Sequence, residues 1–339
     1  MSEYYTVVVK LDAPRKHTNA DSLEIFDVFG GYPCLTHIGD FKEGDLAAYL
    51  SVDALAPLDH AKFSFLKGRH EKTVDGKQYS RVSAMRLRGV FSMGLLVKAD
   101  PEMKEGDDVS SVWGIQKYEP PEFRGGPSRP GGKFSSGNFI KDIGVTPVYD
   151  IDGYRKYKYL LEEGEEVWIT EKVHGCSSKY IQYNDVFYAG SRNGFKNREQ
   201  ADRDLWWQIA TKYKLEEKLK TIPNIALYGE VYGQVQDLRY GKDSHEFIAF
   251  DCYNVESRRW LNVDDFLQLC QSLEIPTVPT LYRGPWNSDL VSLAEGNTTF
   301  PNASHIREGC VIKPVINRRD ERIGRVFLKL VGEGFLTRK

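Results

Sequence analysis

The sequence has few cysteines and no long hydrophobic run. Its 339 residues include only five cysteines, an odd number without a Cys-x-x-Cys spacing. This pattern argues against a disulfide framework and a zinc site, and it favours reduced thiols in a cytosol-like compartment. No segment is long and apolar enough to span a membrane, and residues 1–5 lack the basic and then apolar pattern of a secretion signal. We therefore expect a cytoplasmic or nuclear protein with no membrane partner.

A large excess of charge of either sign is also missing. The formal net charge is −2 at pH 7, with 28% charged and 41% hydrophobic residues. A near-neutral chain gives no electrostatic indication of a nucleic-acid partner, although a basic groove can coexist with an acidic remainder. The chain is longer than one domain usually is, so two domains are expected.

The chain divides into three parts with different patterns. Residues 1–118 predict an OB-like β-barrel that binds nucleic acid, because short β-branched or aromatic runs alternate with turns and glycines. Residues 119–147 are rich in glycine and proline and form the predicted linker. Residues 148–339 mix hairpin and helix patterns, which predicts an antiparallel α+β domain. In the first part, strands are expected at residues 7–9, 23–29, 32–35 and 45–50 and within 86–97.

In the third part, hairpins are expected to alternate with helices. A hairpin is expected over residues 179–188, with its turn at Asn184 and Asp185. One amphipathic helix is expected over residues 198–220, and a second begins after Asn262, a good N-cap residue, and ends near residue 273. Further strands are expected at residues 225–231, 247–252, 310–313 and 326–329.

Lys172 is the residue most indicative of function. It follows the apolar run of residues 167–169 and precedes a turn that ends at Gly175. A lysine at a strand end can be directed into a cleft as a nucleophile, provided that burial or nearby charge lowers its pKa. Its target is then either a carbonyl group, through a Schiff base, or a phosphoryl group.

Charged residues downstream favour the phosphoryl target. Phosphoryl groups need neutralisation by lysine, arginine or a metal ion, and Arg192, Lys313 and Lys329 supply cations. Glu230 and Glu308 supply carboxylates, which are ligands that magnesium and manganese prefer.

Six segments resemble, in order, the motifs of the covalent nucleotidyltransferases, a superfamily of DNA ligases, RNA ligases and mRNA-capping enzymes. The segments are residues 172–175 (KVHG), 191–194 (SRNG), 227–231 (LYGEV), 247–251 (FIAFD), 308–313 (EGCVIK) and 327–330 (FLKL). Each segment alone is common, because a Lys-x-x-Gly turn or a strand-end glutamate is usually structural. Their order within one domain is what makes the resemblance specific, and it implies an ATP-grasp-like ligase fold for the α+β domain.

The resemblance implies a role for each matching residue. Lys172 would attack the α-phosphate of ATP and carry AMP as a lysyl adduct. The other residues implied to bind the nucleotide are Glu171, Arg192 on the nucleotide, Glu230 at the ribose, Phe250 on the base, and Lys313 and Lys329 on the α-phosphate. Glu308 and Glu230 would hold Mg²⁺ or Mn²⁺. Lys172, Lys313 and Lys329 are thus the expected catalytic residues.

Two features indicate a branch of the superfamily. His174 stands where DNA ligases and capping enzymes usually have aspartate, and only residues 332–339 follow the last motif, so the expected OB domain lies before the catalytic domain. Both features resemble the ATP-dependent RNA ligases that seal 3′-OH/5′-phosphate nicks in duplexed RNA. The resemblance implies nicked duplex RNA or an RNA:DNA hybrid as partner and a monomeric enzyme. The last motif departs from the family pattern, because Val331 occupies the place of a second lysine.

Three alternatives to an RNA ligase stay open. A capping guanylyltransferase would use GTP, a DNA ligase would prefer a DNA nick, and an inactive nucleic-acid-binding module would have no reason to keep all the charged site residues. Residues 86–95 are the candidate duplex contact of the first domain, and Arg155 and Lys158 are candidates to meet the departing phosphates.

Overall fold

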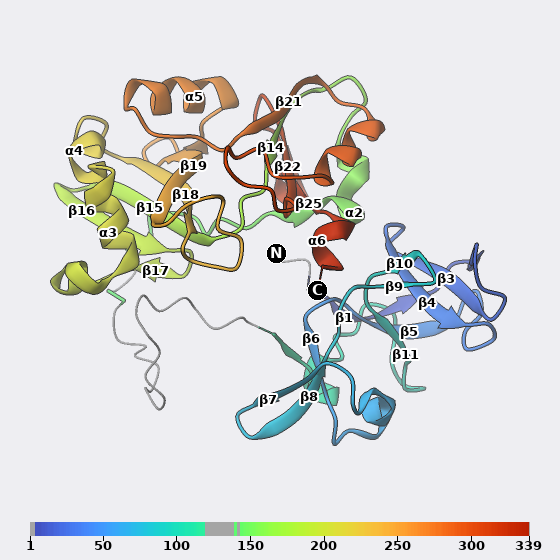
Figure 1. Ribbon diagram of the computed structural model, residues 1–339. Helices are drawn as coiled ribbons and strands as arrows, with labels where there is room; N and C mark the ends of the chain where they lie inside the picture. Colours follow the sequence, from blue (N-terminus) through green and yellow to red (C-terminus); the bar gives the residue numbers. More distant parts are fainter. Residues whose placement is uncertain (1–3, 119–138, 141–142, 339) are drawn as a thin grey trace. The chain divides into compact units, whose positions relative to one another are not determined.

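The computed structural model describes residues 4–118, 139–140 and 143–338, and it divides into two compact units (Figure 1). Among the described residues, the first unit contains 4–118, Asp152–Lys158 and 336–338, and the second contains 139–140, 143–151 and 159–335. Most of the predicted linker, residues 119–147, lies outside the described residues, so its limits stay a prediction.

The first unit is built from short antiparallel strands around two small cores. One sheet has the order β1-β5-β11 and another the order β2-β3-β4. Their bounds are β1 Thr6–Lys10, β2 Arg15–Lys16, β3 Leu23–Val28, β4 Tyr32–His37, β5 Leu46–Leu50 and β11 Leu95–Lys98. Four of the five residues of β5 are buried, because this central strand contacts both cores. Each of the expected strands in residues 7–50 is present.

The rest of this unit was predicted less well. A sheet of order β12-β6-β8-β7 was not predicted at all, and the run 86–97 is three strands, of which β9 and β10 form a hairpin at Arg88 and Gly89. The bounds are β6 Ala54–Pro57, β7 Glu71–Val74, β8 Lys77–Arg81, β9 Met85–Leu87, β10 Val90–Ser92, β12 Gln116–Lys117, η1 Ala61–Leu66 and α1 Ser110–Trp113. Charged and polar residues in β7 and β8 obscure the strand alternation.

The second unit is built mainly on two large antiparallel sheets. One has the order β17-β16-β15-β18-β19-β20, and the other contains β25, β22, β14 and β21 in that order. Their bounds are β14 Glu166–Glu171, β15 Cys176–Tyr183, β16 Val186–Ser191, β17 Gly194–Phe195, β18 Ile225–Gly233, β19 His245–Asn254, β20 Arg259–Trp260, β21 Thr280–Pro285, β22 Gly309–Pro314 and β25 Leu328–Val331. The smaller elements of the chain are β13 Asp152–Gly153, α2 Tyr154–Tyr157, η3 Lys158–Leu160, η5 Ser288–Ala294, β23 Arg319–Asp320, β24 Gly324–Arg325 and α6 Glu333–Leu336.

The single helix expected over residues 198–220 is wrong in detail. The segment is broken into η4 Arg198–Arg203, α3 Leu205–Lys212 and α4 Leu215–Lys220. Asp204 starts α3 by accepting hydrogen bonds from the backbone N–H groups of Trp206 and Trp207, and Lys214 separates α3 from α4 with a left-handed φ of 53°. The apolar periodicity continues across the breaks, which is why the pattern alone predicts one helix.

Two other local predictions agree with the structure. β15 and β16 form a hairpin whose turn residues, Asn184 and Asp185, have φ values of 48° and 60°, as a tight hairpin turn requires. Helix α5, Val263–Ser272, follows Asn262, although the Asn262 side chain accepts a hydrogen bond from the backbone N–H of Asn317 instead of from the helix. Helices α3, α4 and α5 pack against strands of the β15–β19 sheet (Figure 1).

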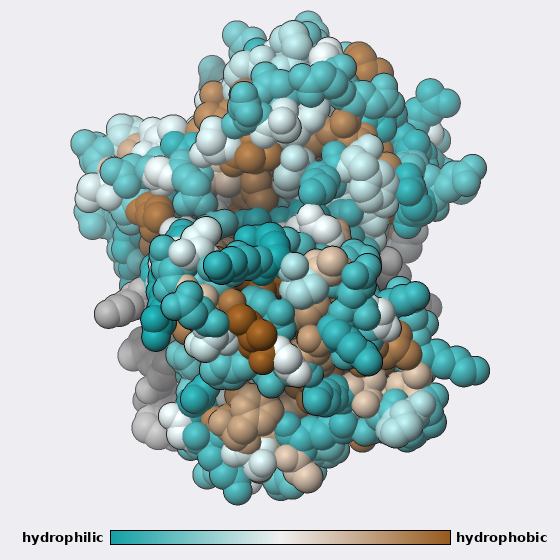
Figure 2. Space-filling model, turned by 90° about the vertical axis from the view of Figure 1, so that its right-hand side faces the viewer, coloured by the Kyte–Doolittle hydropathy of each residue, from teal (hydrophilic) through white to brown (hydrophobic). Residues whose placement is uncertain are grey.

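Large apolar side chains are exposed at several positions in the described part of the chain, among them Phe65, Met85 and Ile316. The face in Figure 2 is mainly hydrophilic, with patches of hydrophobic residues between hydrophilic ones. Scattered exposed apolar side chains of this kind are ordinary for a folded chain. Among the described residues, no helix is both long and apolar enough to cross a membrane.

The cap at Asp204 gives a test of the broken helix. We expect Asp204→Ala to lower the free energy of unfolding by about 1 kcal/mol, because two backbone N–H groups of α3 lose their acceptor. Asp202→Ala, an exposed carboxylate two residues earlier, is the matched control and should change stability by less than about 0.5 kcal/mol. Thermal or urea unfolding of both variants measures the difference, and equal losses would contradict the capping role.

Candidate active site

Lys172 lies directly after β14 and forms an ion pair with Glu308, the residue directly before β22. Its Nζ is 2.5 Å from Oε1 of Glu308, and its backbone N–H donates to the carbonyl oxygen of Gly309. The antiparallel register brings these residues together, because Glu171 lies opposite Cys310. The Lys172 side chain is 24% exposed and that of Glu308 is 11% exposed, so the ion pair is largely shielded but can be reached.

His174 completes a line of polar contacts that leads from the ion pair to the exposed Asp237. Its Nδ1 lies 3.1 Å from the second oxygen of Glu308, and its Nε2 lies 3.0 Å from Oδ1 of the exposed Asp237. The backbone N–H of His174 donates to the hydroxyl of Tyr240 at 2.6 Å. The imidazole therefore fixes the orientation of Glu308, which in turn holds Lys172.

Gly175 allows the turn after the nucleophile to pack closely on β18. A Cβ atom at this position would lie 2.1 Å from the backbone oxygen of Val231 and 3.0 Å from Cγ of Glu230. Only glycine fits such an approach of two backbones. The close packing brings Glu230 near enough to Lys172 for the lysine charge to influence the glutamate pKa.

Glu230 and Glu308 have opposite electrostatic environments. Burial raises the pKa of Glu230 to about 8, with Glu308 adding to the rise and Lys172 opposing it. Burial would also raise the pKa of Glu308, but Lys172 and His174 outweigh it and hold that pKa at about 2. The two carboxylates thus influence each other. A further cation would offset both the cost of burying an ionised Glu230 and the repulsion between the two carboxylates.

This environment fits a hard divalent cation. Carboxylate oxygens with water in the remaining positions are what Mg²⁺ and Mn²⁺ prefer. Among the described residues, no group of three or more histidine, cysteine, aspartate or glutamate side chains forms a metal site, so Glu230 and Glu308 would provide a partly hydrated one.

Arg192 and Lys329 lie on different sheets. Arg192 follows β16 in a turn, and its guanidinium contacts Asp150 at 3.1 Å. Lys329 is on β25 opposite Val311 of β22, and Val311 lies opposite Thr170 of β14. Because directly paired residues of neighbouring strands share a face, Lys329 projects to the same face as Thr170, two residues before Lys172.

Phe250 owes its position to a β-bulge. In the pairing of β18 with β19, Tyr228 lies opposite Asp251, but the next residue, Gly229, lies opposite Ala249. Phe250 is therefore the extra residue, and a bulge of this kind changes the direction of a side chain. Its ring packs against Tyr149, with 4.6 Å between ring centroids.

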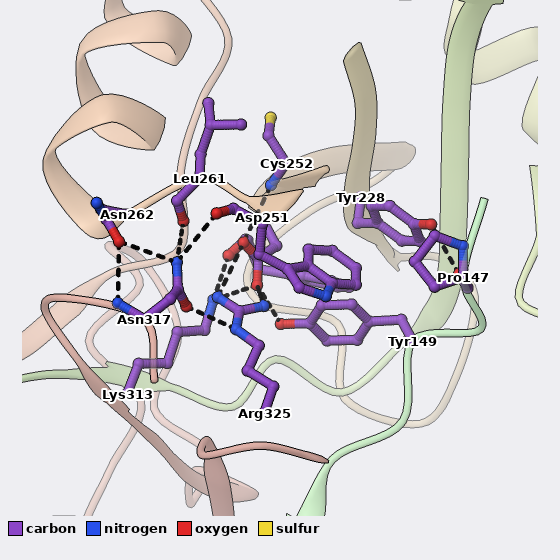
Figure 3. Close-up of polar contacts among 12 residues, drawn as sticks. Pro147, Tyr149, Tyr228, Asp251, Cys252, Leu261, Asn262, Lys313, Asn317 and Arg325 are labelled. Atoms are coloured by element: carbon purple, nitrogen blue, oxygen red, sulfur yellow. Dashed lines mark hydrogen bonds and ion pairs between the residues drawn. The ribbon is translucent and has the colours of Figure 1, made fainter. Parts of the chain in front are cut away.

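In the structure, Lys313 forms an ion pair with Asp251. Its Nζ donates to Oδ2 of Asp251 at 2.9 Å and to the carbonyl oxygen of Phe250 at 2.6 Å, and the residue is 4% exposed (Figure 3). Burial lowers the pKa of Lys313 to about 8, although Asp251 opposes the shift. These contacts favour a structural role for this ammonium over the expected contact with phosphate.

Glu171 also has protein partners for both its oxygens. Oε1 accepts a hydrogen bond from Thr298 Oγ1 at 2.5 Å, and Oε2 accepts from the backbone N–H and the hydroxyl of Thr299 at 2.8 and 2.7 Å. The residue is 1% exposed. Its carboxylate anchors the 298–299 segment next to the end of β14.

Arg155 and Lys158 lie with the first unit. Arg155 is 5.6 Å from the ring of Phe91, and Lys158 donates to the carbonyl oxygen of Gly30 at 2.9 Å. These contacts are different from the phosphate contacts expected from the sequence.

Sequence reasoning missed several residues of this site. They are Tyr149, Asp237, Tyr240, Thr298, Thr299 and Arg325. The sequence did indicate that a buried cation was needed near Asp251. Asp251 is a charged residue inside the apolar run 247–252, and a charge on an interior strand needs a buried partner. Nothing in the sequence indicates which residue would be that partner.

Two family models match the chain. The RNA ligase model matches residues 165–331, and an OB-fold domain model matches residues 6–99. With the fold and the strand-end lysine, these matches define the class as a ligase domain preceded by an OB-fold domain. Residues 165–331 match the RNA ligase family, in line with the ordered motifs, and the protein is an enzyme. No curated protein matches the chain.

Solved structures of the RNA ligase of Naegleria gruberi share the fold. An apo variant has a TM-score of 0.82 at 24% identity, covering 98% of this chain and 97% of that one. A variant with ATP and Mn, and the ligase with PPi, each give 0.82 at 23% identity and cover 98% of both chains. The likeness confirms the predicted fold class, an OB barrel followed by an α+β ligase domain.

The anchoring of Glu171 can be tested without changing Lys172, Glu308 or Glu230. Thr298→Val keeps the side-chain shape but removes a hydrogen bond to a buried carboxylate, so we expect the free energy of unfolding to fall by about 2 kcal/mol. Thr221→Val removes an exposed hydroxyl bond to Lys218 and should cost less than about 1 kcal/mol. Denaturant unfolding of the two variants compares these values. A Thr298→Val loss no larger than the control would show that the anchor contributes little.

Proposed function

We propose that the protein is an ATP-dependent RNA ligase that seals 3′-OH/5′-phosphate nicks in duplexed RNA through a lysyl–AMP intermediate on Lys172. The ion pair of Lys172 with Glu308, at the meeting point of β14 and β22, carries this proposal. It combines a shielded, reachable amine with a carboxylate environment that suits a divalent cation. The match of residues 165–331 to the RNA ligase family supports RNA as the joined polymer.

The chemistry runs in three displacements. Nζ of Lys172, after giving up a proton, bonds to the α-phosphorus of ATP, and the bond to the β-phosphate oxygen breaks to release pyrophosphate. The 5′-phosphate of the RNA strand then displaces the lysine and takes the AMP. Finally the 3′-hydroxyl attacks that 5′-phosphorus and releases AMP. Dividing one condensation in this way is the general advantage of covalent catalysis.

The nucleotide is proposed to lie between the two sheets. Phe250 would stack on the base, Glu230 would contact the ribose, and Lys329 would neutralise the α-phosphate. Arg192 would hold the nucleotide once it leaves Asp150, and Glu171 would contribute by fixing the strand end. A divalent cation held by Glu230 and Glu308 would supply neutralisation of phosphate charge.

The first unit is proposed to bind the nicked duplex. OB folds bind oligonucleotides on their barrel surface. The candidate segment 86–95 includes most of the β9–β10 hairpin, which carries Arg86 and Arg88 on exposed positions. We further propose that the enzyme acts as a monomer and that the linker lies between residues 118 and 148, with Asp152–Lys158 of the following segment packing with the first unit.

The lysyl–AMP step has a direct test. Incubation with ATP labelled at the α-phosphate should transfer label to the wild-type protein, and Lys172→Ala should abolish it, because no other group carries the AMP. Label at the γ-phosphate should not transfer. Lys220→Ala, an exposed lysine of α4, is the control and should label fully. Persistent labelling of Lys172→Ala would refute the assignment of the nucleophile.

The substrate class can be tested by comparing how well RNA, hybrid and DNA nicks are sealed. We expect sealing of a nick with RNA on the 3′-hydroxyl side to exceed sealing of an all-DNA nick by at least about 10-fold, since recognition of one 2′-hydroxyl is worth roughly 1–3 kcal/mol. Gel assays with matched RNA, hybrid and DNA nicks, with ATP or GTP, measure this. Preference for the DNA nick would indicate a DNA ligase, and labelling by GTP alone would indicate a capping enzyme.

A further inference from the structure

A buried cluster of four residues lies beside Phe250 and joins the two sheets of the second unit. We call it the Asp251 cluster: Asp251 on β19, Lys313 on β22, Arg325 at the end of β24, and Tyr149 (Figure 3). Each of these residues is at most 8% exposed. The Asp251 carboxylate accepts hydrogen bonds from Lys313 at 2.9 Å, from Arg325 at 2.7 Å and from the Tyr149 hydroxyl at 2.8 Å.

The charges in the cluster are matched well enough to persist in the interior. Burial would raise the pKa of Asp251, but Arg325 and Lys313 outweigh it, and the net shift is downward. Arg325 is held in turn by Asn317, whose oxygen accepts from Nε at 2.7 Å, and by stacking on Trp260 and Phe327. A buried carboxylate that accepts hydrogen bonds from several donors makes its surroundings rigid.

Phe250 is held by two members of this cluster. Lys313 donates to its carbonyl oxygen at 2.6 Å, and Tyr149 packs on its ring. The bulge removes Phe250 from the regular pairing of β18 with β19, so these contacts replace the ladder as its restraint.

The same strand links the cluster to the nucleophile. β22 has Gly309 at its first position, hydrogen-bonded to Lys172, and Lys313 near its other end. A rigid strand therefore connects the point that holds Phe250 with the point that holds Lys172.

We propose that the Asp251 cluster is a positioning device that fixes Phe250 relative to Lys172 and so sets the affinity for the nucleotide base. This inference rests on the proposed function, in which Phe250 stacks on the base. It assigns Lys313 to positioning and not to the α-phosphate, and it makes Tyr149 a residue that acts on the nucleotide through Phe250.

Tyr149→Phe tests the proposal with little risk to folding, because the ring that packs on Phe250 is kept. Tyr228→Phe is the matched control: Tyr228 is a buried neighbour, but its hydroxyl donates to the carbonyl oxygen of Pro147 and not to the cluster (Figure 3). In both variants the tyrosine hydroxyl and its hydrogen bond are removed and the ring is kept.

Affinity for ATP is measured by calorimetry in a Lys172→Ala background, which separates binding from chemistry. We expect Tyr149→Phe to raise Kd about 5-fold and Tyr228→Phe to leave it within about 2-fold. Phe250→Ala should raise Kd about 10-fold through lost stacking. In the Phe250→Ala background, Tyr149→Phe should have no further effect, because both changes act on one contact.

Two results would overturn the proposal. One is an equal change in Kd for Tyr149→Phe and Tyr228→Phe, and the other is independent, multiplicative effects of Tyr149→Phe and Phe250→Ala. Failure of the proposed function is visible separately. If wild-type protein is not labelled by ATP while the Kd values follow the expected pattern, the lysyl–AMP step is wrong and the positioning role stands.

Discussion

The pairing of β14 with β22 is the constraint on which the rest of the site depends. It brings Lys172 and Glu308, 136 residues apart, to an Nζ–Oε1 distance of 2.5 Å. Gly309 makes the approach of β25 to β22 possible, because a Cβ there would lie 2.1 Å from the backbone oxygen of Leu330. The close packing of three strands therefore determines which charged groups meet at the strand ends.

The second unit has two groups of charged residues, one partly exposed and one buried. Near the surface, Lys172, Glu308 and His174 form contacts that a ligand can displace, since Lys172 is 24% exposed. In the interior, Asp251 and its partners are fixed, because removing one member of a buried ion pair leaves the other uncompensated at a cost of about 3–5 kcal/mol. An exchangeable group next to a rigid one is what a site needs to bind and release a substrate in a constant orientation.

Much of the fold could be predicted from the sequence, but only part of the site. The ordered motifs predicted the catalytic fold and directed attention to Lys172 and Glu308, which the structure places in contact. The bulge at Phe250 and the partners of Lys313 were not predictable, because both depend on which strands pair. The prediction of a single helix over residues 198–220 was wrong, because the breaks at Asp204 and Lys214 leave the spacing of the apolar residues unchanged. Strands β7 and β8 were missed because their exposed polar residues hide the alternation.

The packing of Asp152–Lys158 with the first unit has a consequence for how the protein can be divided. Nζ of Lys156 lies 4.3 Å from the ring of Tyr5 and 4.4 Å from that of Phe29, and a Cβ on Gly31 would lie 2.1 Å from the backbone oxygen of Arg155. A fragment that ends at residue 118 would leave this aromatic surface bare and prone to aggregate. A single cut therefore cannot separate the two units, because residues 143–151 belong to the second unit and Asp152–Lys158 to the first. An N-terminal fragment needs the 152–158 peptide fused through a short flexible tether, and a catalytic fragment has to keep residues 143–151.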